Sequence, residues 1–308
     1  MTKKVLSVFL SLVMMLAVCV PAFAADGEAL PYENSRFFSY GDYELHYRFE
    51  PHEGLYKGRI MFIHGFGQSS FSWENMADEM SAKGYDCYCV DLPNFGYSTR
   101  ENAEMELIDR ETLVEKLMLS IAPASSWTLA GHSMGGAVAI NVAQQVDVQK
   151  LMLFCAAPVA DMGNMGNMGG MMSSPIMSGM LDFVFKYLTK IDILMRLIVL
   201  MATANLEYTK NYNLEGVTAP LQLDGTGEGL CMLMQTMRPT DLEGAADIKC
   251  PVLIVNAEKD MIINNSMKQQ IAGAFPSAEH YLVEDGGHIC IEDRAEELAD
   301  VAFNFLNK

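Results

Sequence analysis

Residues 126–138 read Ser-Trp-Thr-Leu-Ala-Gly-His-Ser-Met-Gly-Gly-Ala-Val and decide the fold. A short apolar run ends at Gly131, a run of small residues typical of a helix starts just after Ser133, and positions 131–135 match G-x-S-x-G. A strand that turns at once into a helix strains the corner residue, and the positions two before and two after it come so close that only glycine fits. The stretch therefore predicts a nucleophile at Ser133, followed by the free amide of Met134 at the helix start.

The first 24 residues have the pattern of a secretory signal peptide. Lys3 and Lys4 precede an apolar run at 5–20, and Ala22-Phe23-Ala24 closes the segment. This order predicts cleavage after Ala24 and a secreted or extracytoplasmic protein. The run is short for a spanning helix, so an uncleaved membrane anchor is the weaker alternative, and no stable membrane span is expected after cleavage.

Composition narrows the possible partners. The 308 residues carry a formal net charge of −18, which becomes −20 once the signal and its two lysines are removed. Such an acidic chain repels phosphate backbones, so nucleic acid is not expected as a partner. Six cysteines remain after Cys19 leaves; those at 87, 89 and 155 lie in strand-like runs and are expected to be small buried hydrophobes. Disulfide pairing and oligomeric state stay open.

Strand-like and helix-like segments alternate over most of the chain. After a hairpin at 36–50, apolar strand-like runs are expected at 59–63, 85–92, 127–130, 150–155, 251–256 and 280–283, and helices at 71–83, 104–121, 265–274 and 292–305. Mostly apolar strands between helices predict an α/β fold with a mostly parallel central sheet covered on both faces. Functional residues then gather beyond the carboxyl ends of the strands.

The alternation stops between the first part of this core, 25–157, and its second part, 250–308. We expect 158–249 to form a methionine-rich helical cap, because 161–201 alone holds nine methionines. Soft, unbranched side chains suit a wall that adapts to acyl chains of varied shape. A copper(I) site is an alternative use of thioethers, although 161–201 contains no histidine or cysteine to support it. A flexible apolar loop is the other alternative for the glycine-rich part.

A serine hydroxyl needs a base, and the base needs a group that orients it. His288 follows two glycines in a loop after the last predicted strand and is the expected base. Asp260 follows the strand at 251–256 and stands 28 residues before His288, which gives the order Ser, Asp, His. Glu258 could serve instead of Asp260.

An oxyanion hole needs two amides directed at one point. The amide of Met134 is the first candidate, and the amide of Phe66, in the loop after the strand at 59–63, is the second. Glycines at 65 and 67 free that loop's backbone. His64, which opens the loop, is expected to brace it by hydrogen bonds. No C-x-x-C metal spacing is present, and neither a metal nor a cofactor is expected.

These motifs together resemble the α/β-hydrolase superfamily, and most closely its monoacylglycerol lipase, esterase and serine-aminopeptidase-like branch. The segments that carry the resemblance are His64-Gly65-Phe66-Gly67, the run at 91–98, Gly131-His132-Ser133-Met134-Gly135-Gly136, Asp260 and Gly287-His288; it covers roughly 36–306 apart from the cap. It implies hydrolysis of esters or amides through an acyl-enzyme, without a cofactor. Asn94 departs from the glycine usual in this branch. Epoxide hydrolases and haloalkane dehalogenases share the fold but use an aspartate nucleophile, so Ser133 argues against both.

The expected function is a secreted serine hydrolase that cleaves small-molecule carboxylic esters, with apolar or lipid-like acyl chains suggested by the cap. One alternative on the same fold is an aminopeptidase that removes an N-terminal residue such as proline. It would direct cap acids at the substrate amine, and the candidates are Glu207, Glu215, Asp224 and Glu228. Another alternative is a binding protein that keeps the three catalytic residues but turns over negligibly. Acyl length and the choice between ester and amide stay open.

Overall fold

The structure is a computed structural model that describes residues 32–159 and 175–308. The predicted signal peptide and the Met-Gly repeat at 162–172, with the copper(I) alternative that depends on it, lie outside the described residues. Within the described part of the chain, none of the helices combines the length and apolarity that crossing a bilayer requires.

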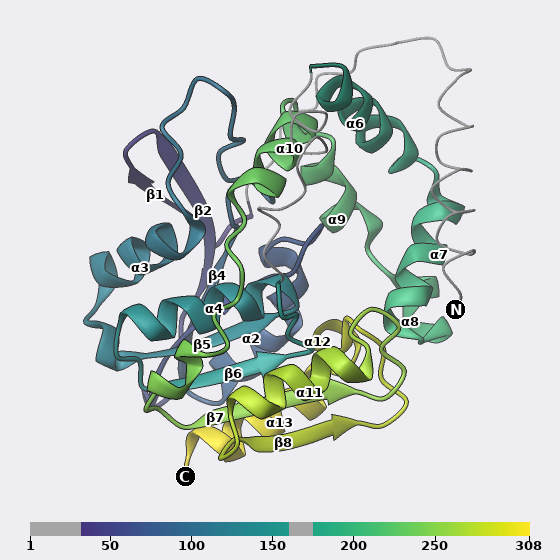
Figure 1. Cartoon of the computed structure of the whole chain (residues 1–308). Coiled ribbons are helices and arrows are strands. Elements are labelled where there is room, and N and C mark those ends of the chain that lie inside the picture. Colours follow the sequence, from purple (N-terminus) through teal and green to yellow (C-terminus); the bar gives the residue numbers. More distant parts are fainter. Residues whose placement is uncertain (1–31, 160–174) are drawn as a thin grey trace.

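One eight-stranded sheet runs through the molecule in the order β1-β2-β4-β3-β5-β6-β7-β8 (Figure 1). The first two strands pair antiparallel, β2 pairs antiparallel with β4, and the strands from β4 through β8 along this order are parallel to their neighbours. This confirms the predicted α/β fold class and its mostly parallel sheet. The strands are β1 (Ser35–Tyr40), β2 (Tyr43–Glu50), β3 (Gly58–Ile63), β4 (Tyr85–Val90), β5 (Trp127–His132), β6 (Lys150–Phe154), β7 (Val252–Ala257) and β8 (Glu279–Val283).

Both faces of the sheet are covered, which explains why its strands are apolar throughout. Along β3, Ile60 and Phe62 join one buried cluster, and Met61 and Ile63 join the other, as the two-residue period of a strand requires. The first cluster includes buried side chains of α2 (Glu74–Ala82) and α13 (Ala295–Leu306). The second includes those of α3 (Arg110–Ile121), α4 (Met134–Gln145) and α11 (Asn265–Ala274).

Three predicted helices differ from the observed ones at their ends. The helix expected at 104–121 begins only at Arg110, because the Asp109 side chain accepts a hydrogen bond from the amide of Thr112 (2.8 Å) and caps the helix there. The helix expected at 292–305 is divided into α12 (Cys290–Asp293) and α13. That expected at 71–83 is a 3-10 helix, η1 (Ser70–Trp73), followed by α2. Two further 3-10 helices are η2 (Ala124–Ser126) and η3 (Gly244–Asp247).

Five described helices lie between β6 and β7, within the range expected for the cap. They are α6 (Pro175–Leu188), α7 (Asp192–Thr203), α8 (Leu206–Asn211), α9 (Leu214–Leu221) and α10 (Thr226–Thr236). In Figure 1 they stand apart from the helices that cover the sheet, with α6 beside α10 and α7 beside α8. The division into core and cap stays a prediction.

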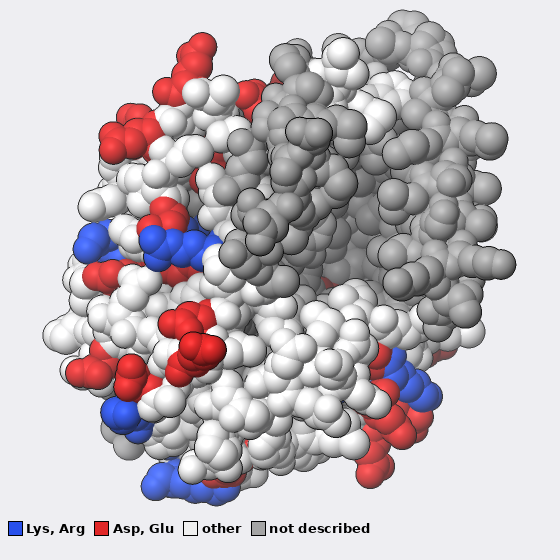
Figure 2. Space-filling view, viewed as in Figure 1, with Lys and Arg blue, Asp and Glu red and all other residues white. Residues whose placement is uncertain are grey.

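Acidic groups are spread over the surface rather than gathered at one point on the face shown in Figure 2, and basic groups lie beside several of them. Some of the basic groups form local ion pairs, such as Lys259 with Asp285 (2.5 Å) and Lys83 with Asp300 (2.9 Å), and the acidic excess remains unpaired.

Candidate active site

Ser133 occupies the corner between β5 and α4. Its backbone angles are φ 52° and ψ −119°, a conformation that non-glycine residues rarely adopt. The corner is tied to the next strand by two hydrogen bonds, from the Ser133 amide to the Phe154 carbonyl (3.1 Å) and from the Ala157 amide to the Ser133 carbonyl (3.0 Å). The strained corner therefore has the geometry of a nucleophile elbow.

The glycines of the G-x-S-x-G motif are required by close approaches. A Cβ atom at Gly131 would lie 2.3 Å from the carbonyl oxygen of Gly135, and one at Gly135 would lie 2.3 Å from that of Ile63. Real Cβ atoms essentially never approach so closely, and backbone atoms cannot easily move away. The need for glycine at both positions is confirmed, but the contact at Gly135 is with β3 rather than with the corner itself.

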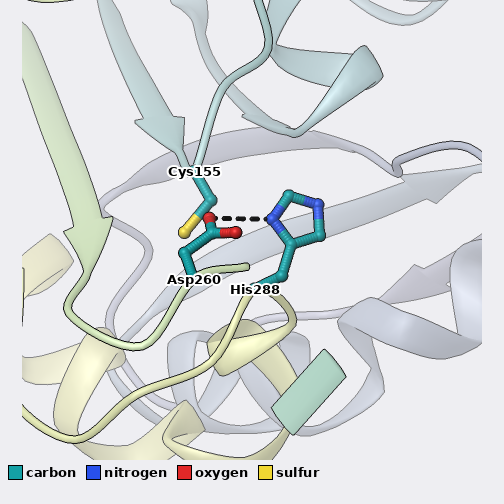
Figure 3. A group of neighbouring side chains, drawn as sticks. All are labelled: Cys155, Asp260 and His288. Carbon is teal, nitrogen blue, oxygen red and sulfur yellow. Dashed lines mark hydrogen bonds and ion pairs between the residues drawn. The ribbon is translucent and has the colours of Figure 1, made fainter. Parts of the chain in front are cut away.

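Asp260 and His288 meet at the carboxyl edge of the sheet. The Asp260 carboxylate lies in the loop after β7 and His288 in the loop after β8, and since these strands are neighbours, His288 Nδ1 lies 2.9 Å from Asp260 Oδ2 (Figure 3). The other carboxylate oxygen of Asp260 accepts hydrogen bonds from the amides of Ile262 (2.8 Å) and Ile263 (2.9 Å). The carboxylate is thus oriented by its own loop before it meets the imidazole.

The electrostatics of this pair favour a charged imidazole. Burial alone would lower the pKa of His288, but its hydrogen bonds with Asp260 and with Cys155 raise it to about 9. Burial alone would raise the pKa of Asp260, but the hydrogen bond with His288 and the amides of Ile262 and Ile263 lower it. The carboxylate therefore stabilises the imidazolium, the state that a general base passes through.

The loop that carries His288 is held from two sides. His132, next to Ser133, places its Nε2 2.9 Å from the carbonyl oxygen of His288. From α7, the carbonyl of Ala202 accepts a hydrogen bond from the amide of Ile289 (3.1 Å). At Gly287 an added Cβ would lie 2.3 Å from that same carbonyl, so glycine is needed where the loop passes α7. His132 therefore joins the corner at Ser133 to the loop of His288.

The loop after β3 lies directly against the corner. A Cβ at Gly65 would meet the Cβ of Ser133 at 3.0 Å, and Phe66 follows in a turn that the Gln68 amide closes on the Gly65 carbonyl (3.3 Å). Gln68 also holds this loop, because its Oε1 accepts a hydrogen bond from the Gly65 amide (2.9 Å) and lies 2.7 Å from His132 Nδ1. Met134 is the first residue of α4, and amides in the first turn have no partner inside the helix. The oxyanion roles of Phe66 and Met134 stay predictions.

His64 braces the start of this loop, as expected. Its Nε2 accepts a hydrogen bond from the amide of Leu92 (3.0 Å), and its Nδ1 lies 2.7 Å from the carbonyl oxygen of Gly65. The ring is fully buried, and this burial lowers its pKa. His64 is therefore a neutral link between the loops after β3 and β4.

The alternative acids have other partners. Glu258 accepts a hydrogen bond from the amide of Asp285 (2.9 Å), whereas Asp260 contacts the imidazole. Among the cap acids weighed for an aminopeptidase, three contact neighbours within the protein: Glu207 with Lys210 (3.0 Å), Asp224 with Lys186 (3.0 Å) and Glu228 with the amide of Ala103 (3.3 Å).

The structure explains why asparagine can replace the usual glycine at position 94. Its φ is 75°, in the left-handed region where glycine and asparagine are favoured. The buried side chain donates a hydrogen bond to the Glu101 carboxylate (2.6 Å) and accepts one from the Glu101 amide (2.7 Å). The departure from glycine thus anchors the segment after β4.

Sequence reasoning missed Gln68 and the thiols beside the Asp260–His288 pair. Cys155 and Cys290 are buried with their sulfurs 3.9 Å apart, and a Cys155 sulfur, an Asp260 oxygen and a His288 nitrogen lie within 4.8 Å of one another (Figure 3). This group has donor atoms that a metal could use. However, hydrogen bonding to Cys290 and burial raise the pKa of the Cys155 thiol well above its usual value, so it holds its proton, and His288 Nδ1 already pairs with Asp260. No motif marks these thiols, since they are 135 residues apart.

The family assignment follows from this fold and site. A family model described as alpha/beta hydrolase fold matches residues 58–295, and the chain belongs to that family. "Lipase 1" of Psychrobacter immobilis is 26% identical over 257 residues, which cover 78% of this chain and 74% of the relative. "Lipase 3" of Moraxella sp. (strain TA144) is 23% identical over 78% of this chain and 75% of the relative.

Solved structures agree with the fold. An epoxide hydrolase superposes with a TM-score of 0.68 at 18% identity, covering 89% of this chain and 98% of its own. The enol-lactonase of Burkholderia xenovorans LB400 also gives 0.68, at 15% identity, covering 89% of this chain and all of its own (100%). At these identities the likeness concerns the fold alone.

Proposed function

We propose that this protein is a secreted serine hydrolase that cleaves carboxylic esters with apolar acyl chains. The observation that carries the proposal is the Asp260–His288 pair, 2.9 Å apart, on the same sheet edge as the strained corner at Ser133. The family is that of hydrolases, and two relatives bear the name lipase, which supports ester cleavage. Secretion rests on the signal-like pattern at 1–24, and the N-terminal sequence of the exported protein would test it.

The proposed reaction has two halves. The Ser133 hydroxyl attacks the ester carbonyl while His288 takes its proton, and Asp260 stabilises the imidazolium. The amides of Phe66 and Met134 bind the oxygen on which negative charge develops. His288 then returns the proton to the leaving alcohol, and a water molecule activated by the same ring releases the acid from Ser133.

Apolar side chains near the pair support the choice of substrate. Ile193, Leu197 and Met201 on α7 are 80%, 49% and 39% exposed, and the same helix contacts the His288 loop. Met261 and Ile262, directly after Asp260, are 57% and 56% exposed. Exposed apolar groups on the helix and the loop that contact this centre favour acyl chains over polar substrates.

Replacement of Ser133 by alanine tests the nucleophile. Ser133→Ala should lower the hydrolysis of p-nitrophenyl butyrate by about 10⁴-fold or more and abolish labelling by a fluorophosphonate, because the proposed acyl-enzyme forms on the Ser133 hydroxyl. Ser126→Ala, at the end of η2 just before β5, is the matched control and should keep both activities. Turnover retained in Ser133→Ala would refute the assignment.

The same reagents separate the alternatives. A wild-type protein that binds esters but does not react with the fluorophosphonate would be a receptor. Faster cleavage of a proline anilide than of any ester in a series of graded acyl length would favour the aminopeptidase.

A further inference from the structure

A cavity lies near the proposed catalytic residues and is not lined by any of them. Its volume is about 460 Å³, within the size range of small-molecule sites, and it lies between η1, α2, α8 and α12. Three aromatic side chains, Phe71, Tyr208 and Tyr212, and three acids, Glu74, Glu207 and Glu292, contribute to its lining, and asparagines complete it.

Glu292 is the unusual group in this cavity. The residue is only 5% exposed, and its Oε2 is buried without a hydrogen bond of acceptable geometry. The hydroxyls of Tyr208, Tyr212 and Ser72 lie near the carboxylate, but none of them forms a hydrogen bond of good geometry with Oε2. Its Oε1 accepts a long hydrogen bond from the side-chain Nε2 of Gln68 (3.5 Å). A buried carboxylate left in this state costs free energy unless a ligand pairs with it.

Glu292 also lacks the counter-charge that its acidic neighbours have. Glu74 pairs with Arg48 (2.6 Å) and Glu207 with Lys210 (3.0 Å). Asp293, next in the chain, lies 4.0 Å from Arg294. Among residues 32–159 and 175–308, no lysine, arginine or histidine forms an ion pair with Glu292. Burial raises its pKa to about 7, so at pH 8 the carboxylate is an unpaired anion.

The walls favour an organic cation over a metal ion. The described residues bring three ligand atoms of histidine, cysteine or acids together only at Cys155, Asp260 and His288, so the carboxylates of this cavity do not form a three-ligand cluster. The aromatic rings are close, with centroids 6.1 Å apart for Phe71 and Tyr212 and 5.5 Å for Tyr208 and Tyr212. Aromatic faces beside a carboxylate suit an ammonium group.

We propose that this cavity binds a primary ammonium ion that carries a short apolar chain, with the nitrogen on Glu292 and the chain against Phe71, Tyr208 and Tyr212. Gln68 connects the site to the catalytic residues, since its side chain contacts Glu292, the Gly65 amide and His132. An ammonium ligand would therefore sit one side chain away from the loop that holds Phe66.

Isothermal titration calorimetry tests the proposal. The full-length protein is titrated with n-butylammonium chloride at pH 8 and low salt. We expect saturable binding of one equivalent, with 1-butanol, the neutral analogue, binding at least about tenfold more weakly because it cannot pair with the carboxylate. Glu292→Gln keeps the shape of the side chain, and its affinity for n-butylammonium should fall by at least the same factor of about ten. Glu296→Gln, an exposed acid one turn further along the chain, is the matched control and should bind like the wild type.

The proposal is overturned if wild-type protein shows no saturable binding, if 1-butanol binds as tightly as the amine, or if calcium chloride binds and the amine does not. The comparison of amine and alcohol on wild-type protein stands even if Glu292→Gln fails to fold. Binding is measured without an ester substrate, so a failure to bind the amine would not contradict the proposed esterase activity. Conversely, a Ser133 that does not react with the fluorophosphonate would not contradict the ammonium site.

Discussion

The described residues form two buried His–Asp pairs, one in the candidate active site and one outside it. His46 on β2 places Nδ1 2.7 Å from Asp91 Oδ2, with both side chains fully buried. The His288 and Asp260 side chains, 2.9 Å apart, are 6% and 0% exposed. The two pairs thus look alike by distance and burial.

The second ring nitrogen distinguishes them. In His46 it lies 2.7 Å from the Ser35 hydroxyl, so the ring is held on both sides. Asp91 further accepts hydrogen bonds from the amides of Ser70 (2.5 Å) and Tyr97 (2.8 Å). For His288, the described residues give no hydrogen bond to Nε2. A ring with both nitrogens committed fixes loops, whereas a ring with one nitrogen free can accept a proton from a substrate or a nucleophile.

The largest expected effect is at the second pair. Asp260→Asn should lower kcat for ester hydrolysis by about 10³- to 10⁴-fold, because an amide neither stabilises the imidazolium nor keeps the ring tautomer. The midpoint temperature of thermal unfolding, measured by circular dichroism, should change by only a few degrees. A variant with near-normal kcat would show that another acid, with Glu258 the first to examine, orients His288.

At the His46–Asp91 pair we expect a substitution to lower stability rather than activity. Asp91→Asn should lower the free energy of unfolding by about 3 kcal/mol, because it removes the charge that pairs with His46 and weakens the hold on Ser70 and Tyr97. The kcat of the folded fraction should stay within about threefold of the wild type. Urea unfolding and active-site titration measure the two quantities. Loss of kcat without loss of stability would contradict the distinction between the pairs.

The smallest effect expected is a change of rate with pH. The base must be neutral and the pKa of His288 is raised to about 9, so kcat/KM should rise about tenfold per pH unit from pH 7 and level off near 9. The opposite sign holds for stability. A raised pKa stabilises the fold fully below the unfolded value of about 6.5, and that contribution is lost as the pH rises through about 9. A flat kcat/KM from pH 7 to 9 would contradict the assignment of His288.

The nucleophile corner could be read from the sequence because its causes are local. Gly131 and Gly135 are close to Ser133 in the chain, and the contact that requires glycine at 131 arises between β5 and α4, although the contact at 135 is with the carbonyl of Ile63 on β3. The apolar runs were equally informative, because a strand covered on both faces must be apolar throughout. These runs therefore predicted the mostly parallel sheet. The helix expected at 104–121 was too long because periodicity says little about where a cap such as Asp109 ends a helix.

Contacts between distant segments were decided only by the tertiary structure. Asp260 and Glu258 are equally plausible in the sequence, and it is the turn closed by the amides of Ile262 and Ile263 that directs Asp260 at His288. The partner of His46, the thiols of Cys155 and Cys290 and the unpaired carboxylate of Glu292 carry no motif. Their surroundings are assembled from loops and helices far apart in the chain, and a linear pattern does not encode which loops meet.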